Sequence, residues 1–168
     1  MAIIIVLAGL IIGTSGYVQK KGARSRAEAE IAAMSAALES YKADNGIYPT
    51  SPDTNALRAN STSSISGYTA AGRYLYAQIS GDTDGNPATP GDGRNYMGSA
   101  LKPNMLSPNP PGPGTYIRDP FGNSYGYSTA KAADPAGLNG YNPTFDLWST
   151  GGSSPPVPAD QSSWLKNW

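Results

Sequence analysis

The side chains with the clearest chemical potential form one polar stretch: Asp82, Asp84, Asn86 and Asp92. Oxygens that alternate along a tight turn can converge on one hard cation, so this spacing indicates a candidate calcium site. The pattern is not an EF-hand, because Pro87 replaces its glycine and no Glu closes the loop. A polar surface loop rich in turn-forming residues is the other interpretation, and both stay open.

No other group of residues points to catalysis or to a tightly held cofactor. The chain has no Cys and no His, which excludes disulfides, thiolate or imidazole metal ligands, and Ser–His or Cys–His catalytic pairs. Ser128 and Lys131 fit a Ser-x-x-Lys pattern, but the Ser-Asp-Asn and Lys-Thr-Gly elements that accompany it in acyl-enzymes are absent. We therefore predict no catalytic residues. The formal net charge of +0 gives no general argument for nucleic acid as a partner.

The candidate cation ligands, Ser128 and Lys131 all lie in a Gly- and Pro-rich region. This region follows a long helix, which is expected over residues 1–45. The helix opens with an apolar run, for which we predict a role in membrane insertion and assembly: Ile3, Ile4, Ile5, Leu7, Leu10 and Ile11. This run is short for a bilayer span, which needs about 20 residues. A secretory signal peptide is one interpretation, although no Lys or Arg precedes the run. The other is a membrane helix whose first turns lie before Met1.

The second half of the expected helix has one larger-residue face. Ile31, Met34, Leu38 and Tyr41 follow each other at helical spacing, so they predict a stripe that packs against the rest of the protein. Asn45 with the glycine after it is a typical helix C-cap. We therefore place a boundary between a helix of residues 1–45 and a globular head of residues 46–168.

For the head we predict an α+β fold, with a small antiparallel sheet packed on the helix and long loops. Residues 125–128 are expected to be a strand because a turn at residues 120–123 leads into them, and residues 144–150 because their side chains alternate between two faces. Residues 70–79 are expected to form a short helix. Residues 56–116 are interpreted as a Gly/Pro-rich insertion into a smaller head.

Four segments resemble one protein family. Residues 23–50 contain Leu-Glu-Ser-Tyr-Lys-Ala-Asp-Asn-Gly-Ile-Tyr-Pro-Thr, and residues 119–127 contain Asp-Pro-Phe-Gly-Asn-Ser-Tyr-Gly-Tyr. Residues 145–152 read Phe-Asp-Leu-Trp-Ser-Thr-Gly-Gly, and the chain ends in Lys-Asn-Trp. Together these motifs are similar to those of type IV pilin-like proteins, and most similar to the major pseudopilins of type II secretion.

The resemblance implies a structural subunit of a type II secretion pseudopilus or a type IV pilus-like filament. It implies identical subunits, minor pseudopilins and an inner-membrane assembly platform as partners. It also implies a single pass through the bacterial inner membrane, with the head in the periplasm. The basic cluster after the apolar run would by itself favour the opposite orientation, so the topology stays open on the sequence.

The resemblance also bears on calcium and on a rival function. Related pseudopilins hold calcium with Asp residues after the last long strand, whereas this chain has Gly152, Ser153 and Ser154 there, with Asp160 as the one acidic residue. Calcium therefore remains a candidate ligand and no cofactor is certain. The alternative function is a membrane-tethered exported binding module that forms no filament.

Overall fold

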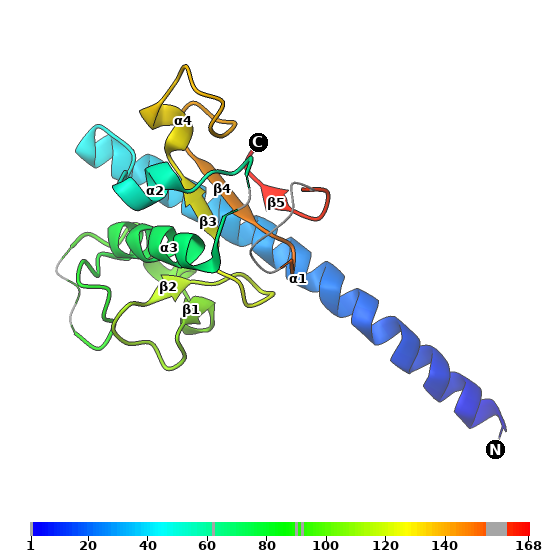
Figure 1. Ribbon diagram of the computed structural model, residues 1–168. Coiled ribbons are helices and arrows are strands. Elements are labelled where there is room, and N and C mark those ends of the chain that lie inside the picture. The colour runs from blue at the N-terminus through cyan, green and yellow to red at the C-terminus, as the bar shows by residue number, and fades with distance from the viewer. Residues whose placement is uncertain (1, 62, 90, 92, 154–160) are drawn as a thin grey trace.

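A long helix with a compact head around its C-terminal part makes up the molecule (Figure 1). The computed structural model describes residues 2–61, 63–89, 91, 93–153 and 161–168, with side chains described from residue 16 onward. Helix α1 runs over Ala2–Asn45 and is 44 residues long, which corresponds to about 66 Å. Its N-terminal part projects beyond the head (Figure 1).

Helix α1 ends where the sequence predicts. Gly46 has a φ of 80°, the left-handed conformation of a helix C-cap, and its N–H donates to the carbonyl of Lys42 at 2.7 Å. The chain then turns back, and α2 (Pro52–Ala56) starts with a capping box in which Ser51 and Thr54 exchange hydrogen bonds.

The head combines short helices with two small antiparallel sheets, so the α+β fold class is confirmed. Helix α3 (Ile65–Ser80) packs against α1 and against strands of both sheets. The three-stranded sheet has the order β3-β4-β5, and the two-stranded sheet pairs β1 with β2. The bounds of these strands are β1 Leu106–Ser107, β2 Tyr116–Ile117, β3 Gly126–Ser128, β4 Asp146–Ser149 and β5 Leu165–Lys166. Single turns complete the head: α4 (Ala130–Ala133), η1 (Gly98–Ala100) and η2 (Pro103–Met105).

The core lies between α1, α3 and the three-stranded sheet. The inner face of α1 meets Leu75 and Ile79 from α3 and Leu147 from β4 in one cluster of buried side chains. A second cluster on the other side of the sheet is built on Trp148, whose ring stacks parallel to that of Trp164 at 5.7 Å. Residues alternate between the two clusters along β4, as expected for a strand buried on both faces.

Several head elements differ from the expectations. Helix α3 begins at Ile65, earlier than expected, because Ser64 caps it by accepting a hydrogen bond from the N–H of Gly67. The Gly/Pro-rich region of residues 56–116, for which the sequence predicts one short helix, also contains η2 and strand β1. These pieces are one turn or two residue pairs long, so they leave no periodic pattern in the sequence.

Among the helices for which side chains are described, none combines the length and the apolar character that crossing a membrane requires.

Candidate functional site: the helix stem and its attachment to the head

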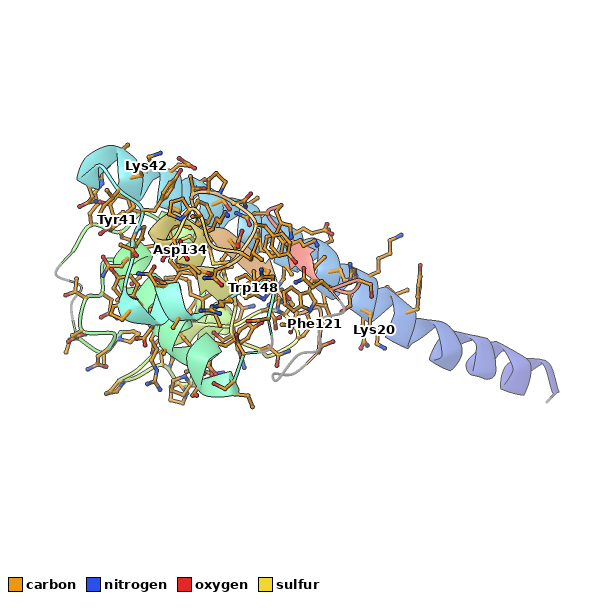
Figure 2. All side chains as sticks on the ribbon, turned by 45° about the horizontal axis from the view of Figure 1, so that its top comes forward. Lys20, Tyr41, Lys42, Phe121, Asp134 and Trp148 are labelled. Atoms are coloured by element: carbon orange, nitrogen blue, oxygen red, sulfur yellow. The ribbon has the colours of Figure 1, made fainter. Side chains whose placement is uncertain are left out.

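The stem of α1, which we define as residues 16–26, is the part of the described helix that leaves the head. Tyr17 and Val18 are 72% and 64% exposed. Figure 2 places Lys20 where the stem emerges beyond the head. Among the side chains of α1 that the structure describes, Ala27 is the first that is fully buried. The stem therefore exposes apolar side chains next to a buried stretch of the same helix.

The predicted attachment residues lie on the buried side of that boundary. Met34 and Leu38 have no exposed surface and Ile31 is 6% exposed. Tyr41 lies at the margin, where its hydroxyl donates to Oε1 of Gln78 at 3.0 Å and its ring contacts that of Tyr96. The stripe therefore joins α1 to the head along about three turns of helix.

A buried charge also joins the stem to the head. Glu30 is 9% exposed, and its Oε1 accepts a hydrogen bond from Nε of Arg26 at 2.9 Å. Its Oε2 accepts a hydrogen bond from the hydroxyl of Tyr125 at 2.7 Å, just before β3. Burial and the neighbouring carboxylate raise the pKa of Tyr125 well above its ordinary value, so the phenol stays protonated and donates to Glu30.

Sequence reasoning missed this group, although a signal for it exists. Glu30 immediately precedes Ile31 and follows Ala27 by three residues, so it falls on the buried stripe of α1. An acidic residue on such a face requires a partner inside the protein. Tyr125 could not have been identified as that partner, because it lies 95 positions further along the chain.

The C-terminal segment fastens the base of the head to the stem. Nη1 of Arg24 donates to the carbonyl of Ser163 at 2.8 Å. Strand β5 then pairs with β4, and Oδ1 of Asn167 accepts a hydrogen bond from the N–H of Leu147 at 2.9 Å. Residues 154–160, which include Asp160, lie outside the described residues.

Asp82 and Asp84, two of the residues predicted to bind a cation, share one hydrogen-bond donor. Oδ1 of Asp82 and Oδ1 of Asp84 each accept a hydrogen bond from the N–H of Asn86, both at 2.9 Å. Their second oxygens also accept protein donors: the hydroxyl of Tyr76 at 2.7 Å for Asp82, and that of Thr89 at 2.9 Å for Asp84. The carboxylates thus organise a turn just after α3.

The fit of this turn to a metal ion is incomplete in the described part of the chain. The residues that the structure describes contain no group of three or more acidic, histidine or cysteine side chains placed to hold a metal. Asp92, the fourth predicted ligand, is outside the described residues. Calcium binding by Asp82, Asp84, Asn86 and Asp92 accordingly remains a prediction.

The Ser-x-x-Lys residues point to separate partners. The hydroxyl of Ser128 donates to the carbonyl of Leu57, and Nζ of Lys131 donates to the carbonyl of Gly137 at 2.7 Å. Both contacts support the fold of the head around α2 and α4.

The residues with a predicted assembly role lie in the first turns of α1: Ile3, Ile4, Ile5, Leu7, Leu10 and Ile11. Their backbone is helical, and their side chains are outside the described residues. The stem therefore continues the same helix from this apolar run to the head.

Comparisons with known proteins agree with this architecture. Residues 16–92 match the family model described as type II secretion system (T2SS), protein G, a match that spans a little under half of the chain. No curated protein and no solved structure matches the chain. The match includes the stem, the buried stripe and α3. Together with the long N-terminal helix and the small antiparallel sheets, this match supports a pilin-like pseudopilin family.

Proposed function

We propose that this protein is a filament subunit of a type II secretion pseudopilus, or of a related pilus-like filament, and that it assembles through α1. The family match supports a pseudopilus role in secretion at the cell envelope. The observation that carries the filament proposal is the division of α1 into an exposed stem and a buried attachment stripe within one unbroken helix.

In this proposal α1 changes its surroundings while the head keeps its structure. Before assembly the apolar run lies in the inner membrane as a single pass, with the head in the periplasm. During assembly Ile3, Leu7 and Leu10, with their apolar neighbours, leave the lipid for the helices of identical subunits. The exchange is feasible because it replaces one apolar environment with another, so helix packing rather than hydrophobicity selects the contact.

The attachment stripe explains how movement of the stem would reach the head. Met34 and Leu38 are packed in the core, and Glu30 is bonded to Tyr125 of the head. Interiors of this kind are close-packed and transmit displacement rather than absorbing it. A subunit that is drawn out of the membrane by its helix would thus carry its head as a rigid unit.

The family implies assembly with other pseudopilins. We propose identical subunits as the neighbours along the filament, with minor pseudopilins and the inner-membrane assembly platform as further partners. The family is a structural one within the secretion system, and the proposal assigns the protein no reaction.

Cysteine crosslinking in cells tests the proposal. The natural chain has no Cys, so single Leu7→Cys and Leu10→Cys variants carry one defined probe each. We expect crosslinked dimers when the secretion machinery is present, and a strong reduction in cells that lack the assembly platform. If neither probe crosslinks while the machinery is active, the protein is a membrane-tethered module instead.

A further inference from the structure

The base of the stem has a run of basic residues, which we name the basic collar: Lys20, Lys21, Arg24 and Arg26. Residues 1–27 contain no Asp or Glu, and the first acidic residue after the collar is Glu28. A local excess of positive charge within a chain of zero net charge requires a partner of opposite sign or full hydration.

The four residues divide into two pairs with different surroundings. Arg24 donates to the carbonyl of Ser163, and Arg26 forms an ion pair with Glu30, so both arginines take part in holding the head. Lys20 and Lys21 are exposed, and neither has a hydrogen-bond or ion-pair partner within the described part of the chain. Figure 2 shows Lys20 beyond the edge of the head.

The position of the two lysines along the helix is what suggests their partner. Val18 is the last residue before a polar stretch, and Tyr17 beside it is 72% exposed. At the rise of an α-helix, Lys20 lies about 3 Å and Lys21 about 4.5 Å beyond Val18 along the axis. Tyr is enriched at both surfaces of a bilayer, so Tyr17 at the headgroup level would place the two lysines beside the lipid phosphates.

We propose that Lys20 and Lys21 bind the phosphate groups of anionic phospholipids, such as phosphatidylglycerol, at the membrane surface from which the head projects. The proposal rests on the single-pass placement proposed above and adds a lipid specificity to it. The two ammonium groups would hold α1 at one depth before assembly. They would have to exchange lipid phosphate for other partners when the helix is extracted.

A second copy of the chain is a less suitable partner for the lysines. Parallel helices in one bilayer would place their collars at the same depth, where like charges repel. The nearest acidic side chain of such a copy, Glu28, would lie about 10 Å further along the axis than Lys21, close to the Debye length at physiological salt.

The test uses the full chain reconstituted into phosphatidylcholine membranes that contain a trace of spin-labelled lipid. The fraction of immobilised label is compared for phosphatidylglycerol and phosphatidylcholine headgroups. We expect a preference for phosphatidylglycerol that falls about thirtyfold in the Lys20→Gln/Lys21→Gln variant, given the usual contribution of each juxtamembrane lysine. High salt should also reduce the preference of the natural chain for phosphatidylglycerol, because it screens the charges of the lysines.

A matched control removes the same charge at the opposite, C-terminal end of α1, as Lys42→Gln/Arg94→Gln, where Arg94 pairs with Asp44, and it should keep the preference. Equal immobilisation of both lipids by the natural chain, or an unchanged preference after loss of both lysines, would overturn the lipid proposal alone. Association of copies that depends on the lysines but not on lipid charge would also overturn it. Failure of the chain to enter the membranes would remove the single-pass placement as well.

Discussion

Glu30 is the residue whose surroundings say most about how α1 is held. A carboxylate at 9% exposure is costly to bury unless its oxygens are bonded. Arg26 supplies a charge on the same helix, and Tyr125 supplies a hydroxyl from the head. The hydrogen bond from Tyr125 forms only when α1 is packed on the head in its native position. This contact therefore favours the native packing of α1 on the head over other arrangements.

Replacement of Tyr125 by Phe removes one hydroxyl and leaves the ring in place. We expect the free energy of unfolding to fall by about 1.5–3 kcal/mol, the usual range for a hydrogen bond to a charged group. Urea unfolding at neutral pH measures the change. The exposed Tyr17→Phe is the control and should stay within about 0.5 kcal/mol of the natural chain. Equal behaviour of the two variants would show that the contact does not stabilise docking.

Asp119 gives a prediction about pH. It is 2% exposed, and burial raises its pKa above the ordinary value of 3.8, despite hydrogen bonds from Ser149 and from backbone N–H groups. The folded state therefore retains this proton at a higher pH than the unfolded chain. The stability that the proton contributes is fully present below pH 3.8 and is lost as the pH rises through the raised pKa.

The Asp119→Asn variant should accordingly lose less stability than the natural chain between about pH 4 and about pH 7. Urea unfolding at several pH values across that window gives the two slopes. Asp53→Asn, at an exposed position of α2, is the control and should keep the natural slope. Parallel curves for the natural chain and Asp119→Asn would contradict the predicted role of Asp119.

At the scale of elements, α1 combines an exposed stem and a buried stripe in one unbroken helix. Its apolar stripe is buried from Ala27 to Leu38, and its stem is exposed before that. Truncation of Leu38 to Ala would leave a cavity between α1 and the head. We expect a loss of about 2–5 kcal/mol in unfolding free energy. Ser40→Ala, on the exposed face two residues later, should change it by less than about 0.5 kcal/mol.

Chemical denaturation followed by circular dichroism distinguishes these two variants. A small effect of Leu38→Ala would mean that the head is stable without close packing on the stripe. The attachment would then be too loose to carry the head with the stem.

The turn after α3 provides the test of calcium. If Asp82 and Asp84 bind the ion together with Asn86 and Asp92, calcium should raise the melting midpoint relative to the same sample in EDTA, since a ligand that binds only the folded state stabilises it. Asp84→Asn should abolish this difference. The same midpoint with and without calcium would rule out the ion as a stabilising ligand.

At the scale of the whole molecule, the sequence predicts the elements that have a periodic pattern or a recognisable cap. It predicts few of the other elements. The spacing of Ile31, Met34 and Leu38 and the glycine at position 46 define α1 and its end, and alternation around Leu147 defines β4. The β1–β2 pair and the contact of Glu30 with Tyr125 depend on residues that meet only after folding. The cation site depends on Asp92 and is still a prediction.

Isolation of filaments tests most directly whether the chain assembles through α1, as we propose. Cells that express the chain together with the secretion machinery should release sheared filaments that antibodies against the head label along their length in electron micrographs. A control strain without the assembly platform should release none. Recovery of the protein solely as single subunits in the membrane fraction, while secretion continues, would contradict the account.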